Sequence, residues 1–179
     1  MVARAATTRP FRIRLGCVTV APQPLGSSGD GWAFCALGHK HWGVYGAAGL
    51  LVRHHAPDGR EFVLLQHRAL WSHHGGTWGI PGGARHSEET PEVAARREVA
   101  EESYLDTAPM HVTGRFVDDH GGWSYTTVVV RVDEAPPVAI RGSESVEFAW
   151  FPADLIGTDE GPLLHPGFAD TWARVRDIG

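Results

Sequence analysis

Three glutamates in one short segment carry the strongest chemical signal in this sequence. Glu98, Glu101 and Glu102 are three and four residues apart, so on an α-helix their side chains project from one face. Carboxylates held this close repel one another, and burial would add to the cost of their charge. A hard divalent cation, Mg²⁺ or Mn²⁺, offsets that cost, because it prefers oxygen ligands and shares its shell with water and phosphates. The spacing favours a metal site acting on a phosphate-bearing substrate over the ordinary alternative, a solvated glutamate-rich helix face.

The residues before these glutamates predict the helix that positions them. Thr90 is a favourable N-cap, Pro91 suits the first helical position, and Glu92 suits the positive end of the helix dipole. We expect the helix to run from about residue 91 to residue 103. The glycines just upstream, Gly82 and Gly83, would let the backbone pass close to a ligand.

Residues 82–105 closely resemble the Nudix box. The box is a glycine, five residues, a glutamate, seven residues and then Arg-Glu-apolar-x-Glu-Glu-x-Gly-apolar. The matching positions are Gly83, Glu89, Arg97, Glu98, Val99, Glu101, Glu102 and Leu105. One position departs, because Tyr104 stands where the family has glycine. Glycine there would end the helix in the left-handed conformation. Tyrosine would adopt it at a cost of about 1 kcal/mol, unless the helix ends differently.

The resemblance implies roles for the residues of the box. Glu98 and Glu102 would be the principal metal ligands, with Glu101 as a further ligand or the holder of a metal-bound water. The carbonyl of Gly82 is a candidate additional ligand. Arg97 and Glu89 would form an ion pair that orients the glutamates without touching the metal. The implied cofactor is Mg²⁺, with Mn²⁺ as the alternative.

The general base in this family often lies on a loop outside the box. Our candidate for base or metal contact is Glu144, in the segment Gly142–Trp150, because a carboxylate shortly before a late strand occupies the comparable place in the nucleotide-pool sanitising members. Glu147 is the alternative, and an ordinary loop acid is the third interpretation. Loop residues often carry function, which keeps the first two open.

Substrate contacts are expected from both sides of the box. Arg68, at the end of an expected strand, resembles a family arginine near the phosphates, and an exposed strand-end arginine is the competing interpretation. His165 stands where some relatives contact the base. Trp78 would join Gly82 and Gly83 at the entry to the box, although most tryptophans serve packing.

The remaining sequence predicts an α/β protein with a mixed β-sheet, which matches the α/β/α sandwich that the resemblance implies. We expect strands at residues 11–20, 32–37, 42–52, 61–67, 112–117, 125–132 and 146–151. Residues 32–37 would pair back on 11–20 as a hairpin, and Pro57-Asp58-Gly59 would turn another. Phe168, Trp172 and Val175 have the spacing of a final amphipathic helix. We divide the chain into an N-terminal extension, 1–41, and a Nudix domain, 42–179.

Charge and hydropathy limit the function classes. The net charge of −5 argues against a nucleic-acid polymer as partner. No run approaches the roughly 20 apolar residues of a membrane span, and no targeting segment stands out. We therefore expect no membrane contact and a cytoplasmic protein.

The cysteines are interpreted as thiols in a reducing cytosol. There are two, Cys17 and Cys35, too few for a disulfide framework. The spacing Cys35-x3-His39-x-His41 also fits part of a zinc site, but it lacks the second cysteine pair typical of such sites. Free thiols are the favoured interpretation.

Together these residues predict a Mg²⁺-dependent Nudix pyrophosphohydrolase with a nucleotide substrate. The compact chain most resembles the sanitising group, which converts NTPs or oxidised dNTPs such as 8-oxo-dGTP to the monophosphate and pyrophosphate. ADP-ribose or a dinucleoside polyphosphate is the alternative substrate. A catalytically idle nucleotide-binding module is the rival from another class, supported only by Tyr104. The aromatic stretch Trp32-Ala33-Phe34 suggests a homodimer or partner contact if it is unpaired.

Overall fold

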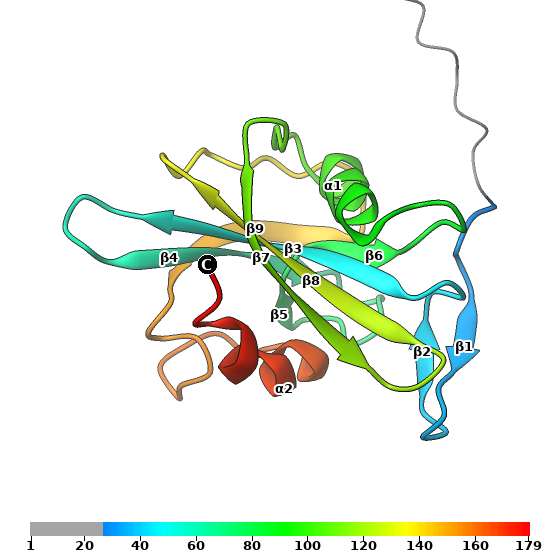
Figure 1. Cartoon of the computed structure of the whole chain (residues 1–179). Helices are drawn as coiled ribbons and strands as arrows, with labels where there is room; N and C mark the ends of the chain where they lie inside the picture. The colour runs from blue at the N-terminus through cyan, green and yellow to red at the C-terminus, as the bar shows by residue number, and fades with distance from the viewer. Residues whose placement is uncertain (1–26) are drawn as a thin grey trace, which may run out of the picture.

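The computed structural model describes residues 27–179 and shows a curved β-sheet with one helix on each face (Figure 1). In chain order the elements are β1 (Trp32–Phe34), β2 (Lys40–Trp42), β3 (Ala47–His55), β4 (Glu61–Arg68), β5 (Trp78–Gly79), β6 (Gly82–Ala84), α1 (Pro91–Glu102), β7 (His111–Asp119), β8 (Ser124–Val132), β9 (Ser145–Pro152) and α2 (Pro166–Val175). Neither helix is long and apolar enough to cross a membrane, within the described residues.

The main sheet is mixed, as expected. Its strands follow the order β5-β4-β3-β8-β7, while β6 pairs with β3 and β9 pairs with β4. β3 and β8 run parallel, and the other pairs are antiparallel. β1 and β2 form a separate two-stranded sheet.

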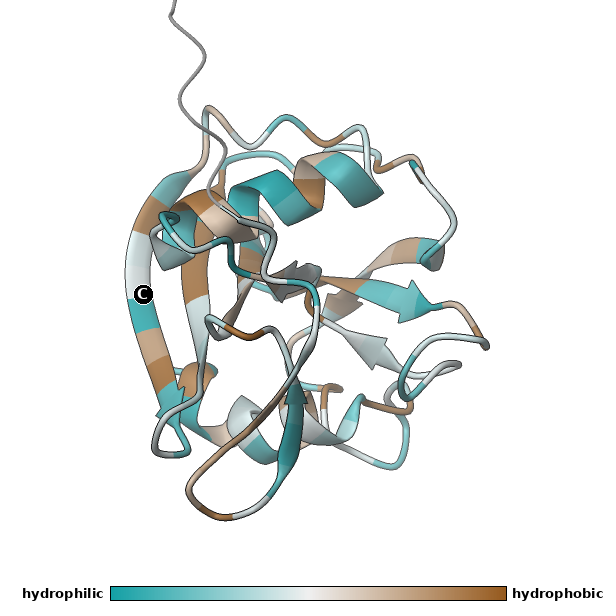
Figure 2. Cartoon of the chain, turned by 90° about the vertical axis from the view of Figure 1, so that its right-hand side faces the viewer, coloured by the Kyte–Doolittle hydropathy of each residue, from teal (hydrophilic) through white to brown (hydrophobic). Residues whose placement is uncertain are grey.

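Alternation along β3 explains the two-sided core. Leu50 and Val52 face the α1 side, where they pack with Ala94, Ala95 and Val99 of the helix. Leu51 points to the opposite side and belongs to the cluster that contains Phe168, Trp172 and Val175 of α2. Strand side chains alternate between faces, so a strand buried on both sides is apolar throughout. Figure 2 shows hydrophobic and hydrophilic residues alternating along α1, whose apolar side faces the sheet.

Most of the predicted elements are confirmed. The turn Pro57-Asp58-Gly59 joins β3 to β4 as an antiparallel hairpin, and Gly59 has φ 85°. The N-cap is also as predicted, because the backbone N–H of Val93 donates to Thr90 Oγ1 over 3.3 Å. The three late strands and the final helix lie where the periodicity placed them.

The N-terminal hairpin differs from the prediction. β1 pairs with β2, so Trp32 lies opposite Trp42. The predicted partner strand, residues 11–20, lies outside the described residues. The short strands β5 and β6 were not predicted, because segments of two and three residues carry no readable alternation.

The end of α1 shows how the chain accommodates Tyr104. The cap residue is Ser103, in extended conformation with φ −143° and ψ 169°, and its hydroxyl donates to the carbonyl of Val99. Tyr104 then runs beside the segment before β9, donating its backbone N–H to the Ala139 carbonyl. Among described non-glycine residues only His74 has a positive φ. The helix therefore ends differently, and Tyr104 avoids the left-handed conformation altogether.

Candidate active site

Two glycines fix how the α1 glutamates meet the sheet. A Cβ on Gly83 would lie 2.5 Å from Glu98 Oε2, so glycine here makes room for that carboxylate. A Cβ on Gly82 would lie 2.4 Å from the Ala48 carbonyl oxygen, which keeps β6 close against β3. Both positions are therefore glycine for lack of space, with no special φ required.

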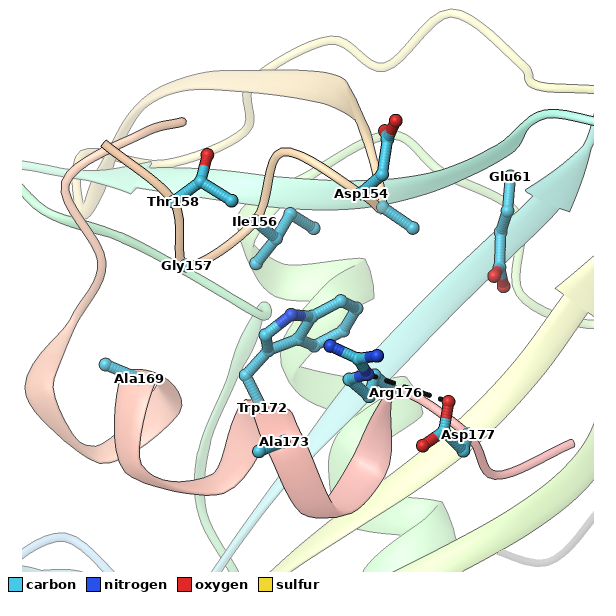
Figure 3. Close-up of a pocket in the computed structure, with 11 residues that line it drawn as sticks. Glu61, Asp154, Ile156, Gly157, Thr158, Ala169, Trp172, Ala173, Arg176 and Asp177 are labelled. Atoms are coloured by element: carbon cyan, nitrogen blue, oxygen red, sulfur yellow. Dashed lines mark ion pairs between the residues drawn. The ribbon is translucent and has the colours of Figure 1, made fainter. Parts of the chain in front are cut away.

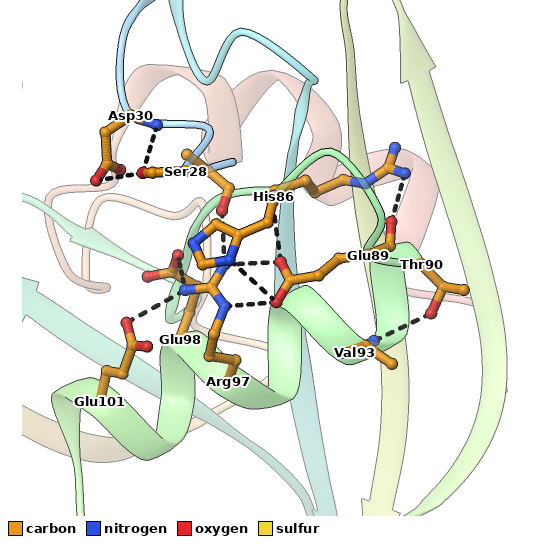
Figure 4. A network of polar contacts seen from close by, with 11 residues as sticks. Ser28, Asp30, His86, Glu89, Thr90, Val93, Arg97, Glu98 and Glu101 are labelled. Carbon is orange, nitrogen blue, oxygen red and sulfur yellow. Dashed lines mark hydrogen bonds and ion pairs between the residues drawn. The ribbon is translucent and has the colours of Figure 1, made fainter. Parts of the chain in front are cut away.

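Arg97 lies at the centre of an ion-pair network that includes its predicted pair with Glu89 (Figure 4). Its guanidinium donates to both carboxylate oxygens of Glu89, over 2.7 and 2.9 Å. The same group donates to Glu98 over 2.8 Å and to Glu101 over 3.2 Å. A fourth partner is the Ala84 carbonyl of β6. The planar guanidinium thus fixes the positions of the loop before α1, of strand β6 and of two α1 carboxylates relative to one another.

The glutamates differ in burial. Glu101 is exposed, Glu98 is half-buried, and Glu102 is buried at 7% exposure. Burial raises the pKa of Glu98 to about 7, reinforced by the charges of Glu101 and Glu144 and opposed by Arg97. Burial likewise raises the pKa of Glu102 to about 8, with Gln66 opposing and Glu98 adding to the effect.

These carboxylates fit a divalent cation. Glu102 Oε2 is buried with no hydrogen-bond partner among the described residues, and an orphaned carboxylate oxygen is costly unless something binds it. Glu98 and Glu102 stand four residues apart on the same helix face, and the charge of Glu98 raises the pKa of Glu102, which favours a cation beside them. The donor set is all oxygen, which is the chemistry of Mg²⁺ or Mn²⁺.

Gln66 is a site residue that the sequence did not reveal. It lies fully buried on β4, donates to Ser145 Oγ over 2.7 Å, and its amide moderates the pKa of Glu102. A polar residue inside an otherwise apolar strand, Val63-Leu64-Leu65-Gln66, was the available signal, because a buried amide needs a polar partner.

The structure distinguishes the two acidic residues that are candidates for the general base. Glu144 and Glu147 are both exposed, but only the charge of Glu144 acts on the pKa values of Glu98 and Glu102. The Glu144 carbonyl accepts from the Ala69 backbone N–H just beyond β4, which anchors this loop beside the strand end. Glu147 lies opposite His67 within the β4–β9 pairing.

The expected substrate residues gather at the same end of β4. The charge of Arg68 lowers the pKa of both Glu102 and His165, and its Nε donates to the His73 carbonyl. Burial is the main reason that the pKa of His165 falls to about 4, so the ring is neutral near pH 7. His165 lies beside His74, with ring centroids 4.9 Å apart.

Trp78 has the surroundings of a packing residue. His67 stacks on its ring at 4.6 Å with an interplanar angle of 7°, and Phe151 meets it edge-on at 4.8 Å. Its backbone carbonyl accepts from the N–H of His165. Trp78 thus holds the His165 segment against the sheet, and its contact with substrate stays a prediction.

A hollow of about 550 Å³ lies away from these residues (Figure 3). Its lining includes Glu61, Ile156, Trp172 and Arg176, between α2 and the loop that follows β9. Glu61 begins β4, whereas Arg68 ends it. The candidate active-site residues therefore lie at the opposite end of β4 from this hollow.

Comparison with known proteins agrees with this geometry. The model of the NUDIX domain family matches residues 46–171. A Mycobacterium tuberculosis H37Rv protein named "Putative 8-oxo-dGTP diphosphatase 3" is 45% identical over 166 residues, covering 89% of this chain and 75% of that protein.

Solved structures of Nudix hydrolases are also similar to this chain. The crystal structure of RenU, a Nudix hydrolase from M. smegmatis, is 44% identical, covers 83% of this chain and 94% of its own, and superposes with a TM-score of 0.74. A C. elegans Ap4A hydrolase complex is 17% identical over 73% of this chain and 95% of its own, with a TM-score of 0.56. That second likeness concerns the fold alone.

Proposed function

Because this chain belongs to the Nudix family and is a Nudix pyrophosphohydrolase, we propose that it hydrolyses a nucleoside triphosphate to the monophosphate and pyrophosphate, with an oxidised dNTP such as 8-oxo-dGTP as the substrate. The name of the M. tuberculosis relative supports this substrate class. The observation that carries the proposal is the glutamate face of α1, held by Arg97 against β6 with a buried, unpartnered oxygen on Glu102.

The divalent cation is proposed to be Mg²⁺, held by Glu98 and Glu102 with Glu101 and the Gly82 carbonyl as further candidates. When bound, it supplies positive charge against the anionic phosphates and lowers the barrier to attack by water. Arg97 keeps Glu98 in place, because its bidentate pair with Glu89 leaves the guanidinium little freedom.

The other residues act on water and substrate. Glu144 accepts a proton from the water that adds to one phosphorus of the α–β bridge. As the bridging P–O bond breaks, the group on the other side leaves with the electron pair: pyrophosphate if water adds to the α-phosphorus, the nucleoside monophosphate if it adds to the β-phosphorus. Arg68 offsets phosphate charge from the end of β4. His165 is neutral at pH 7 and lies beside His74. It would contact the nucleobase without adding charge.

A substrate panel tests the proposal. The full-length protein is incubated with dNTPs, 8-oxo-dGTP, ADP-ribose and diadenosine polyphosphates, each with Mg²⁺, Mn²⁺ or EDTA. Products are assayed as phosphate with and without inorganic pyrophosphatase. We expect metal-dependent pyrophosphate release, fastest from 8-oxo-dGTP. Preferred turnover of ADP-ribose or a dinucleotide would refute the substrate class but keep the glutamate roles. Nucleotide binding without turnover by the folded protein would favour the idle module.

A further inference from the structure

We propose that Cys35, His39, His41 and His120 bind a structural Zn²⁺ ion that fastens the β1–β2 hairpin to the β7–β8 turn. Each side chain offers one ligand atom, and these atoms all lie within 4.8 Å of one another. Bonds of about 2.0–2.3 Å to zinc put neighbouring ligand atoms of a tetrahedron about 3.3–3.7 Å apart. Small rotations of the side chains are therefore enough to close the site.

Two turns that are distant in sequence bring the four residues together. Cys35 and His39 bracket the β1–β2 turn, where the Cys35 N–H donates to the His39 carbonyl. His120 begins the β7–β8 turn, whose Gly121 and Gly122 have φ of 73° and 76°. The turns touch directly, since the Ala36 N–H donates to the Gly121 carbonyl over 2.7 Å. The backbone thus holds the ligand atoms close before any ion binds.

Two ring nitrogens of this cluster have no hydrogen-bond partner among the described residues, which favours a metal ion as their partner. His41 Nε2 and His120 Nδ1 are both buried with no hydrogen-bond partner among the described residues. Buried nitrogens are normally satisfied, so two such atoms in one cluster need an explanation. A cation between them supplies it, because a neutral imidazole nitrogen is a common zinc ligand.

The surroundings match those of metal-bound histidines. His120 Nε2 lies 3.1 Å from Asp118 Oδ2, so the carboxylate holds one nitrogen and leaves the other, Nδ1, buried and free to bind a metal. This arrangement of carboxylate, histidine and metal is typical of zinc sites. His41 stacks on Trp123 with ring centroids 3.9 Å apart and an interplanar angle of 9°, and the Trp123 indole donates to the Gly43 carbonyl. Both rings are therefore fixed by partners outside the cluster.

The hairpin needs such a fastening. An isolated two-stranded hairpin is marginally stable in water, and the apolar cluster beneath this one contains only Cys35, Ala47 and Trp123 as buried members. Trp32, Phe34 and Trp42 remain 42%, 69% and 43% exposed. One thiolate and three imidazoles complete a four-coordinate zinc shell, which describes a structural ion with no open position.

Cobalt absorption tests the site without relying on enzyme activity. The full-length protein is reduced, freed of metal with EDTA and titrated with Co²⁺ in the presence of excess Mg²⁺. We expect one equivalent of Co²⁺ to give the intense visible bands of tetrahedral coordination and a thiolate charge-transfer band, both removed by Zn²⁺. Cobalt on the α1 glutamates would be oxygen-bound and would lack the thiolate band. A wild-type protein without that band would overturn the proposal, whatever the variants do.

Variants then assign the ligands. Cys35→Ser and His120→Ala should each abolish the thiolate-cobalt spectrum or reduce zinc affinity at least about 100-fold, with folding checked by circular dichroism. Cys17→Ser is the matched thiol control. His74→Asn is the matched histidine control, because it removes a member of the second histidine group, with His73 and His165, and asparagine tolerates its φ of 54°. Both controls should keep the spectrum. Loss of the band in either control, or its survival in both test variants, would place the ion elsewhere.

Discussion

Two groups of side chains with metal-ligand chemistry, the α1 glutamates and the hairpin cluster of Cys35, His39, His41 and His120, differ in their ligand atoms and in how the chain supplies them. The α1 group is all oxygen, with Glu101 exposed and Glu98 and Glu102 progressively more buried. The hairpin group joins one sulfur and three nitrogens from the β1–β2 hairpin and the β7–β8 turn. The first suits a hard cation that shares its shell with phosphate, and the second suits zinc.

The difference separates catalysis from support. As proposed ligands, the α1 glutamates would leave coordination positions for water and substrate, and the charge of Arg68 acts on both Glu102 and His165. The hairpin cluster has four protein ligands, enough to fill a tetrahedron and leave no place for substrate. On these proposals, the open oxygen site would perform the chemistry, and the closed nitrogen–sulfur site would stabilise a hairpin that lies before the matched NUDIX region, 46–171.

Glu98→Gln should have the largest effect and should act on the first group only. It removes a charged ligand and one partner of Arg97, so metal-dependent pyrophosphate release should fall by about three orders of magnitude. The Co²⁺–thiolate band of the hairpin cluster should be unchanged. Steady-state kinetics at saturating Mg²⁺ measures the rate, with Glu88→Gln, an exposed glutamate of the preceding loop, as control. Activity within tenfold of wild type would show that Glu98 is not a principal ligand.

Glu144→Gln should reduce the rate about 100-fold and flatten the acid limb of the pH–rate profile, because a general base must be deprotonated to act. Glu147→Gln is the matched control, since that residue lies on the same loop-to-strand segment and does not influence the glutamate pKa values. A flattened profile in Glu147→Gln and not in Glu144→Gln would exchange the two roles.

Whether the residues of a group lie close together in the sequence explains how much of that group could be predicted from the sequence. The α1 group occupies residues 83–102 of one uninterrupted motif. Local signals therefore predicted its helix and N-cap, and the resemblance to the Nudix box predicted the Arg97–Glu89 pair. The hairpin cluster needs His120, about 80 residues beyond His41. Spacing in the first segment suggested only part of a zinc site, and free thiols were favoured.

Tertiary contacts account for the other differences. The sequence could not show that Ser103 would cap α1 and spare Tyr104 the left-handed conformation, because the cap depends on pairing with Ala139 and Ile140. Nor did it show that Gln66 would lie beneath Glu102. The sandwich itself was predictable, since the continuous apolar run in β3 and the helical spacing of apolar residues in α2 are local patterns.

The stability of the metal-free protein should depend on pH through the first group. The folded pKa values of Glu98 and Glu102, about 7 and about 8, lie above the ordinary 4.5. The folded state then binds more protons than the unfolded state between pH 4.5 and about 8, so stability falls as pH rises through this window. We expect Tm in EDTA to drop by several degrees from pH 5 to pH 8. Saturating Mg²⁺ should remove most of the drop, as should Glu102→Gln. If the Tm in EDTA rises with pH, and does so equally in wild type and in Glu102→Gln, the assigned pKa shifts are contradicted.

His120→Ala should have the smallest effect on catalysis and so tests whether the two groups are separable. The hairpin reaches the substrate side through one described aromatic contact, Trp32 with His73, at 5.5 Å between ring centroids, and His73 adjoins His74 and His165. Loss of zinc should loosen this contact, raising KM a few-fold while kcat stays within about threefold of wild type, because no α1 ligand moves. Adding Zn²⁺ should raise Tm by several degrees in wild type and not in the variant. A large fall in kcat with Tm unchanged would mean that His120 serves the reaction itself, and the division between an open catalytic site and a closed supporting one would fail.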